Sequence, residues 1–275
     1  MAILIPKKRE VVPRPVSPYE LVNLSHPLAQ DLISAHYFLE GDGSNTRSSL
    51  DGSLDAVGTS NWSVEGLETH ELASDVTLAP SLFSLTSRTF TAFHKINITT
   101  WDASNRYFII GEYEDEGSGF YDGGLYLASA DPNGVVFFPV NGSNFSVCDV
   151  SELMSDTSSV AVVRHATAEW SVYVNGDLAA TSTVSGTTTS IYDWRIGGDW
   201  GAAGNEPAHV KHSAALIYGR DLDAGEIRKL HNNPYQILKP KQEYWVMPVA
   251  AGGVTPEIVP PLPQLNYRQV GRWTQ

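Results

Sequence analysis

The sequence predicts an all-β protein, an antiparallel two-sheet sandwich with one short helix near its C-terminal end. Short segments rich in β-branched and aromatic residues recur along the chain and are bounded by Gly, Asn, Asp or Ser. Asn175-Gly176, a strong two-residue hairpin signal, separates two of these segments. Only one stretch has convincing apolar spacing and capping residues of a helix. Many short strands with tight turns and no repeated helices are typical of a sandwich.

Ten segments are predicted to be strands. The clearest alternation is Trp170-Ser-Val-Tyr-Val174, which runs directly into the Asn175-Gly176 turn. Both turn positions tolerate positive φ, so the segments on either side should pair as a hairpin. The expected strands are residues 76–78, 89–98, 107–111, 124–128, 134–139, 159–164, 170–174, 179–184, 191–196 and 214–218.

The predicted helix covers residues 221–230. Asp223 is its expected N-cap and Glu226 stands at the third helical position, a variant of the capping box. Pro234 should end the helical region. A second short helix over residues 20–31 is an alternative that the pattern leaves open. The apolar face of the first helix consists of Leu222, Ile227 and Leu230.

Composition limits the class of protein. Hydrophobic residues make up 42% of the 275 residues and charged residues 18%, which fits a globular chain with a sizeable core. No run of 18 apolar residues occurs, and the basic residues near the N-terminus follow the apolar start, so neither a membrane helix nor a signal peptide is expected. Cys148 is the single cysteine, and we expect a small buried hydrophobic residue rather than a nucleophile.

Three segments are expected: an extended N-terminal arm over residues 1–20, a sandwich over 21–240, and a Pro-rich C-terminal arm over 241–275. The first segment contains four prolines, and the last combines prolines with interspersed aromatic residues. Residues 1–20 and residues 238–275 each hold four basic and two acidic side chains, whereas the body between them has a net charge of −17. Basic tails on an acidic body suit docking on an acidic protein surface.

Several stretches resemble one known family. Residues 170–176, Trp-Ser-Val-Tyr-Val-Asn-Gly, are similar to a hairpin of laminin-G-like, concanavalin A-like lectin/glucanase domains, and Trp-Arg-Ile-Gly-Gly at 194–198 to the strand after it. Residues 212–227 resemble the family's last strand and helix, and 33–43 its first strand. The ending His-Asn-Asn-Pro-Tyr-Gln-Ile-Leu-Lys-Pro at 231–240 closely resembles that of such domains in phage and prophage genomes.

The resemblance covers residues 32–240 and implies a jelly-roll sandwich. It departs from the family at Ala208-His-Val-Lys-His212, where the family often has Phe-x-Gly, and this departure weakens any inference of a shared ligand rim. Because a fold by itself does not imply an activity, we expect a protein that is not an enzyme.

The function expected is that of a phage virion structural protein, a capsid decoration or cementing subunit on the particle surface. The resemblance and the arms imply other virion proteins as partners, with the major capsid protein first, and a homo-oligomer or high-copy assembly. The protein would be made in the host cytoplasm and carried in the virion, with neither nucleic acid nor membrane as a partner. The alternatives are a tail-associated lectin-like adhesin that binds host glycan and, third, a glycoside hydrolase.

The expected docking residues are basic and aromatic side chains of the two arms. They are Lys7, Lys8, Arg9, Arg14, Lys239, Lys241, Tyr244, Trp245, Arg268, Arg272 and Trp273. Glycan binding would need aromatic platforms beside amides and carboxylates, because sugars stack on rings and form hydrogen bonds through their hydroxyls. The candidates are Trp101, Asp102, Tyr121, Asp122, Asp199, Trp200 and Asn205.

Catalytic and metal-binding patterns are weak. Glu112, Glu114 and Glu116 alternate as the carboxylates of a glucanase strand do, yet Gly117 ends the strand at once, so no catalytic residue is predicted. His209 and His212 stand three apart, and we expect both at the surface. No cofactor is predicted; a structural calcium ion is conceivable in this fold, but the chain has no dense Asp-x-Asp-x-Asp run, and the metal content stays open.

Overall fold

The computed structural model describes fourteen segments of the chain. They are residues 21–40, 45–50, 54–56, 61–63, 66–69, 76–78, 89–101, 107–113, 124–128, 134–138, 145–165, 169–183, 193–196 and 208–239. The chain divides into two units, Met1–Lys239 and Pro240–Gln275. All the elements below belong to the first unit.

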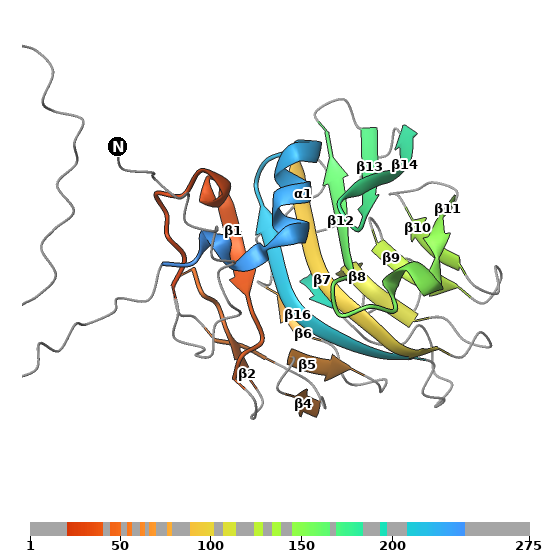
Figure 1. The fold of residues 1–275 in the computed structure, drawn as a ribbon, viewed down its shortest axis with the longest axis horizontal. Helices are drawn as coiled ribbons and strands as arrows, with labels where there is room; N and C mark the ends of the chain where they lie inside the picture. Colours follow the sequence, from red (N-terminus) through yellow and green to blue (C-terminus); the bar gives the residue numbers. More distant parts are fainter. Residues whose placement is uncertain are drawn as a thin grey trace, which may run out of the picture. The chain divides into compact units, whose positions relative to one another are not determined.

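Within the described segments, sixteen strands form two large antiparallel sheets and one two-stranded sheet (Figure 1). The larger sheet has the order β14-β13-β12-β7-β16-β5-β4, and β1 pairs with β16 beside β5. Its strands are β1 Leu32–His36, β4 Asn61–Ser63, β5 Gly66–Thr69, β7 Phe90–Trp101, β12 Ser159–Arg164, β13 Glu169–Val174, β14 Asp177–Thr183 and β16 Ala208–Tyr218.

The second sheet has six strands in the order β11-β10-β9-β8-β15-β6. Its strands are β6 Val76–Leu78, β8 Tyr107–Tyr113, β9 Gly124–Ala128, β10 Gly134–Phe138, β11 Phe145–Asp149 and β15 Asp193–Ile196. The small sheet pairs β2 Asn45–Arg47 with β3 Leu54–Ala56. The all-β sandwich expected from the sequence is therefore confirmed, and each of the ten predicted segments overlaps a strand.

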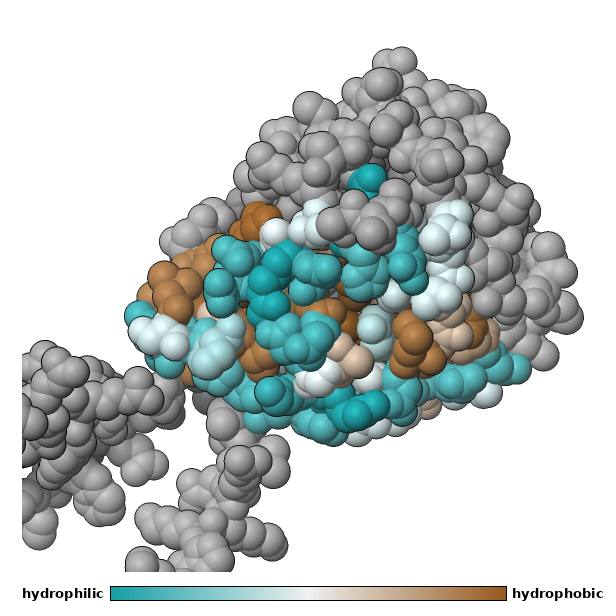
Figure 2. Space-filling model, turned by 90° about the horizontal axis from the view of Figure 1, so that it is seen from above, coloured by the Kyte–Doolittle hydropathy of each residue, from teal (hydrophilic) through white to brown (hydrophobic). Residues whose placement is uncertain are grey.

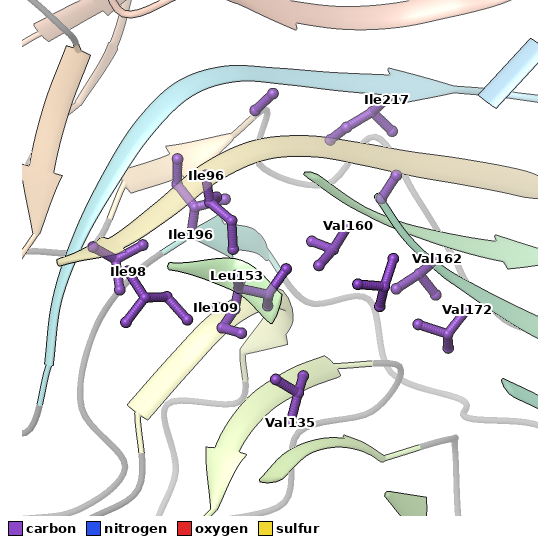
Figure 3. Packing of buried hydrophobic residues seen from close by; sticks show 14 of the residues in the cluster. Ile96, Ile98, Ile109, Val135, Leu153, Val160, Val162, Val172, Ile196 and Ile217 are labelled. Carbon is purple, nitrogen blue, oxygen red and sulfur yellow. The ribbon is translucent and has the colours of Figure 1, made fainter. Parts of the chain in front are cut away.

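The main core fills the space between the two large sheets. Figure 3 shows Ile96 and Ile98 of β7 and Val160 and Val162 of β12 pointing toward the same space as Ile109 of the six-stranded sheet. Alternation in β7 places every second residue on this face, as period two requires. Each fully buried aliphatic side chain contributes roughly 1.5–3 kcal/mol relative to an exposed one, so this core is a major source of stability.

The outer face of the large sheet is buried too. A second cluster joins Phe93 of β7 and Leu216 of β16 to the helix α1 Ala224–Asn232 and to the 3-10 helices η1 Pro27–Ala29 and η3 Pro234–Ile237. A third 3-10 helix, η2 Val150–Leu153, contributes to the main core. The large sheet is thus a central layer with apolar contacts on both faces, which explains the continuous buried pattern of β12 and β13.

Helix α1 begins where the sequence predicts. The backbone N–H of Glu226 donates to Asp223 Oδ1 at 2.8 Å, and the N–H of Asp223 donates to Glu226 Oε2 at 3.1 Å, which completes the capping box. Arg220 then binds both oxygens of Glu226 at 2.8 Å. The apolar residues Leu222, Ile227 and Leu230 are buried, as expected.

Figure 2, seen from above Figure 1, shows hydrophilic residues over much of the coloured surface, with hydrophobic residues in separate groups.

The β13–β14 hairpin confirms the predicted turn. Asn175 has φ of 52° and Gly176 has φ of 85°. A Cβ on Gly176 would lie 3.2 Å from the Cβ of His231 in α1, so glycine allows the turn to lie close against the helix. The amide of Asn175 donates to the carbonyl of Glu152 at 2.8 Å and accepts from the N–H of Ser159 at 3.1 Å.

Some elements of the fold differ from those predicted from the sequence. Five short strands, β2 to β5 and β11, were not predicted. Segments of three to five residues carry little alternation, and the short strands β6, β9 and β10 were predicted from their β-branched and aromatic residues. The alternative helix over residues 20–31 does not form; in this region only η1 is helical, since Pro27 follows directly after His26 and only three residues follow the helical path. His26 caps this turn by accepting from the N–H of Leu28 at 3.2 Å.

Candidate functional site

The two expected arms attach to the body at neighbouring points. Val22 and Leu238 form an antiparallel β-bridge. The N–H of Lys239 donates to the carbonyl of Leu21 at 2.9 Å, and the N–H of Asn23 donates to the carbonyl of Ile237 at 2.8 Å. We call residues 21–24 together with 238–239 the arm root. Residues 1–20 and 240–275 are therefore joined to one small site on the body.

The arm root contains both buried residues and exposed apolar side chains. Val22 and Leu238 are 2% and 6% exposed and belong to the outer cluster, whereas Leu21 and Leu24 are 41% and 67% exposed. Lys239 is exposed. Partial burial and the nearby charge of Lys229 lower the pKa of His26, which favours the neutral form of this ring. The root thus presents leucine side chains beside positive charge.

Of the eleven predicted docking residues, the structure describes Lys239 and places it in the arm root. Lys7, Lys8, Arg9, Arg14, Lys241, Tyr244, Trp245, Arg268, Arg272 and Trp273 lie outside the described residues. What the sequence could not indicate is that the two arms leave from paired backbone segments, because Val22 and Leu238 are more than 200 positions apart.

The predicted glycan-binding residues fall mostly outside the described segments. Trp101 is the last residue of β7, and its backbone pairs with Ala208 of β16. The others, Asp102, Tyr121, Asp122, Asp199, Trp200 and Asn205, lie outside the described residues. The cap formed by α1, η1 and η3 covers part of the outer face of the large sheet, so a sugar cannot bind to that part.

Of the three alternating carboxylates predicted from the sequence, one lies in a described segment. Glu112 lies in β8 in register with Trp194 of β15, and Glu114 and Glu116 lie outside the described residues. Cys148 of β11 is partly buried against the main core, and burial raises the pKa of its thiol to about 12. This thiol therefore stays protonated at neutral pH and is a poor nucleophile.

One hydrogen-bonded chain has the connectivity of a hydrolase triad. Ser171 Oγ lies 2.9 Å from His165 Nε2, and His165 Nδ1 lies 3.3 Å from Asp221 Oδ2. The burial is in the reverse order, because Ser171 is 5% exposed while the side chains of His165 and Asp221 are 28% and 47% exposed. A nucleophilic serine must reach its substrate and its acid partner is buried. This chain of bonds instead ties β12 and β13 to the segment before α1.

The sequence missed a buried histidine cluster. His212 was expected at the surface, but it is fully buried in the core between the sheets; His209 is partly exposed, as predicted. His212 Nε2 lies 2.7 Å from Thr69 Oγ1, and His212 Nδ1 lies 3.0 Å from Nε2 of the equally buried His94. The error arose because the predicted strand began at residue 214, whereas β16 begins at Ala208 and places Val210 and His212 on one buried face.

Burial lowers the pKa of both rings. Loss of solvation is the first cause for each, and it brings the pKa of His212 to about 3. His94 Nδ1 has no hydrogen-bond partner among the described residues. A signal for His94 was present, since it alternates with Ala92 and Ile96 on the apolar face of β7. No group of three His, Cys, Asp or Glu side chains in the described segments could hold a metal ion, so the cluster is not a metal site there.

Comparisons with known proteins agree with this architecture. The model of the concanavalin A-like lectin/glucanases superfamily, laminin-G type, matches residues 71–228, more than half of the chain. The chain belongs to this superfamily. No curated protein matches this concanavalin A-like chain. Within the described segments, no helix is long and apolar enough to cross a membrane.

Solved structures show the same fold at low identity. A Trypanosoma rangeli sialidase in complex with sialic acid is 18% identical with a TM-score of 0.61 and covers 75% of this chain and 33% of its own. The binding domain of Paraclostridial Mosquitocidal Protein 1 is 13% identical with a TM-score of 0.59, over 76% and 53%. The binding domain of botulinum neurotoxin serotype D is 13% identical with a TM-score of 0.55, over 73% and 51%. The concanavalin A-like chain thus spans about a third of the sialidase and half of the toxin domains.

Proposed function

We propose that this concanavalin A-like protein is a structural subunit of a phage virion, a capsid decoration protein that docks on other virion proteins through its terminal arms. The observation that carries the proposal is the arm root, where the Val22–Leu238 bridge brings both attachment points together. Two segments that start from one site can engage one neighbourhood on a partner, so the second contact forms at a high effective concentration. The exposed Leu21 and Leu24 would be covered there.

Charge supports the same arrangement. Each terminal segment has a positive balance, and the body between them is strongly acidic. The acidic bodies would repel one another and nucleic acid, while the basic segments would be attracted to an acidic capsid surface.

The phage-like ending also has a structural role, because Pro234, Tyr235 and Ile237 of η3 are buried under the large sheet. The Tyr37 hydroxyl donates to the carbonyl of Pro234 at 3.1 Å.

The test uses particles stripped of this protein and two versions of the chain, the full-length protein and the body 21–239. The cut follows Lys239 rather than residue 237, because Leu238 is buried and belongs to the body. We expect high-copy rebinding of the full-length chain and at least a tenfold loss for the body alone. A full-length variant with both terminal segments replaced by Gly-Ser of equal length controls for size. Equal rebinding of the body would refute docking through the arms.

A second candidate is carbohydrate binding. Its support is membership in a lectin/glucanase superfamily and the likeness to a sialidase and to two toxin binding domains. In the same experiment the body is applied to a glycan array, with Trp101→Ala and Trp200→Ala as variants. A body that binds glycans through these tryptophans but does not rebind particles would favour the adhesin.

The proposal includes no enzymatic activity. Two observations support this part of the proposal: Ser171 of the Ser–His–Asp chain is buried, and burial raises the pKa of the Cys148 thiol to about 12. The remaining hydrolase hypothesis concerns Glu112 and Glu116, and it would require glycosidase activity that both Glu112→Gln and Glu116→Gln abolish.

A further inference from the structure

The residues that follow β11 present an apolar side chain in a fixed position at the surface. We call residues 149–156 the η2 segment. Val150 and Leu153 are buried in the main core, so one side of this short 3-10 helix is anchored and the other faces solvent. The carbonyl of Glu152 accepts from the side-chain amide of Asn175 at 2.8 Å, which holds the backbone of the segment. Met154 is 48% exposed on this fixed support.

Three exposed carboxylates accompany this methionine: Asp149, Glu152 and Asp156. Residues three apart in a 3-10 helix lie one above the other, which places Asp149 and Glu152 on one side of η2. The N–H of Ser151 donates to Asp149 Oδ1 at 2.8 Å, and this bond lowers the pKa of Asp149. None of the three carboxylates forms an ion pair with a described residue. The η2 segment is thus acidic as well as apolar.

One lysine lies beside the η2 segment, and its ammonium group is bound elsewhere. Lys95 Nζ donates to the carbonyl of Thr157 at 3.1 Å and to the carbonyl of His231 at 3.3 Å. Asp156 accepts instead from the side-chain amide of Asn97. A cation that pairs with these carboxylates would therefore have to come from outside the described segments.

The N-terminal segment of the chain has the complementary chemistry. Residues 3–9 read Ile-Leu-Ile-Pro-Lys-Lys-Arg, and this is the one place in the sequence with three consecutive basic residues. An extended chain spans about 13 Å from Leu4 to Lys8. At the rise of a 3-10 helix, the η2 segment spans about 10 Å from Asp149 to Met154. The apolar and charged groups of the two segments are therefore separated by similar distances.

We propose that the η2 segment is a docking surface for the N-terminal segment of a neighbouring copy of this chain. The apolar residues 3–5 would cover Met154, and Lys7 to Arg9 would pair with the carboxylates. This inference rests on the proposed function for the role of the arms in docking, and it adds a second copy as a partner. A chain that gives its arm to one neighbour and receives an arm from another links the copies head to tail.

The link between the basic residues and the arm root favours a neighbour over the same chain. It contains Pro13, Pro15 and Pro18, and proline-rich links are extended, at about 3.1 Å per residue. The arm root lies just before β1, and Figure 1 shows β1 and β11 on opposite sides of the body. A contact within one chain would need this stiff link to turn back over the body. Because exposed ion pairs are weak singly, the contact gains most where copies are held close together.

The first experiment measures self-association of the full-length protein by sedimentation equilibrium at low ionic strength. The average mass should rise above the chain mass of 30.0 kDa as the concentration reaches hundreds of micromolar. Added salt should lower it, because salt screens exposed charges. Glu152→Lys with Asp156→Lys, and separately Lys7→Glu with Lys8→Glu, should each weaken association at least fivefold. All four substitutions in one chain should restore it, because opposite charges then face each other again.

The matched control is Glu169→Lys with Asp221→Lys, which reverses the same number of acidic charges elsewhere on the body and should associate as the wild type does. A monomeric wild type, an η2 variant that behaves like this control, or no recovery in the fourfold variant overturns the proposal. Rebinding to stripped particles is measured separately. Loss of self-association with rebinding intact rejects this inference alone, and the reverse result rejects the capsid docking alone.

The second experiment locates the contact. Leu4 of the full-length chain is replaced by the photoreactive residue benzoylphenylalanine, and chains with normal and heavy nitrogen are mixed and irradiated. Mass spectrometry should find position 4 of one copy joined to residues 149–156 of another, with both isotopes in one cross-linked peptide. Cross-links within a single chain would show that the arm folds onto its own body, and cross-links to other residues would place the contact elsewhere. Either result overturns the proposal.

Discussion

At the scale of single residues, His94 and His212 lie where a charged ring would lose its solvation. The N···N contact of 3.0 Å between them needs one ring to donate and the other to accept. A proton on the accepting nitrogen removes that bond as well as placing a charge in the core. Both rings are therefore held neutral, as the lowered pKa values indicate.

This pair predicts a loss of stability in acid. The folded-state pKa of each ring is below its unfolded value of 6.5, so the unfolded chain binds more protons once the pH falls below that value. The contribution of this pair to the free energy of unfolding is fully present above about pH 6.5. Well below that pH, the free energy of unfolding should fall by about 1.4 kcal/mol per pH unit for each histidine. Urea unfolding at neutral pH and near pH 5 measures the difference.

The control for this prediction keeps hydrogen-bonding side chains but removes the titration. His94→Gln combined with His212→Gln should lose most of the difference between the two pH values, and the half-exposed His209→Gln should retain it. An identical pH dependence in the double variant and the wild type would show that this histidine pair does not cause the acid loss.

At the scale of elements, helix α1 depends on its first turn. Asp223 satisfies the N–H of Glu226, and Glu226 is bound in turn by Arg220. Asp223→Ala is expected to reduce the free energy of unfolding by about 1 kcal/mol, the usual cost of losing an N-cap. Denaturant titration measures this.

Asp221→Ala is the matched control, since it removes the same charge two residues earlier and breaks only an exposed contact with His165. It should cost less than about 0.5 kcal/mol. Equal losses from the two variants would mean that general charge, and not the cap, stabilises this end of the helix.

At the scale of the whole molecule, the layer that covers the large sheet needs residues from both ends of the described chain. Val22 pairs with Leu238, and Tyr37 binds the carbonyl of Pro234. The cap over the large sheet is therefore assembled from the beginning and the end of the sandwich. A chain that ends at Lys239 should unfold with the same free energy as the full-length protein.

A chain that ends at Asn232 should be less stable by at least about 3 kcal/mol, because removing Ile237, Leu238 and their neighbours opens the outer cluster. Thermal and urea unfolding of the two truncated chains provide the comparison. If both truncations behave alike, the η3 segment is dispensable and the cap does not need it.

The sequence by itself determined the features that depend on neighbouring residues: the short strand β6, the strands of five or more residues other than β11, the Asn175-Gly176 turn and the capping box of Asp223 and Glu226. The tertiary structure alone decided the rest. The bridge from Val22 to Leu238, the bond from His94 to His212 and the uncovered state of β14 each depend on segments far apart in the chain or on what packs beside a strand. Local propensity and period carry no information on such contacts, since they form only when the sheets assemble.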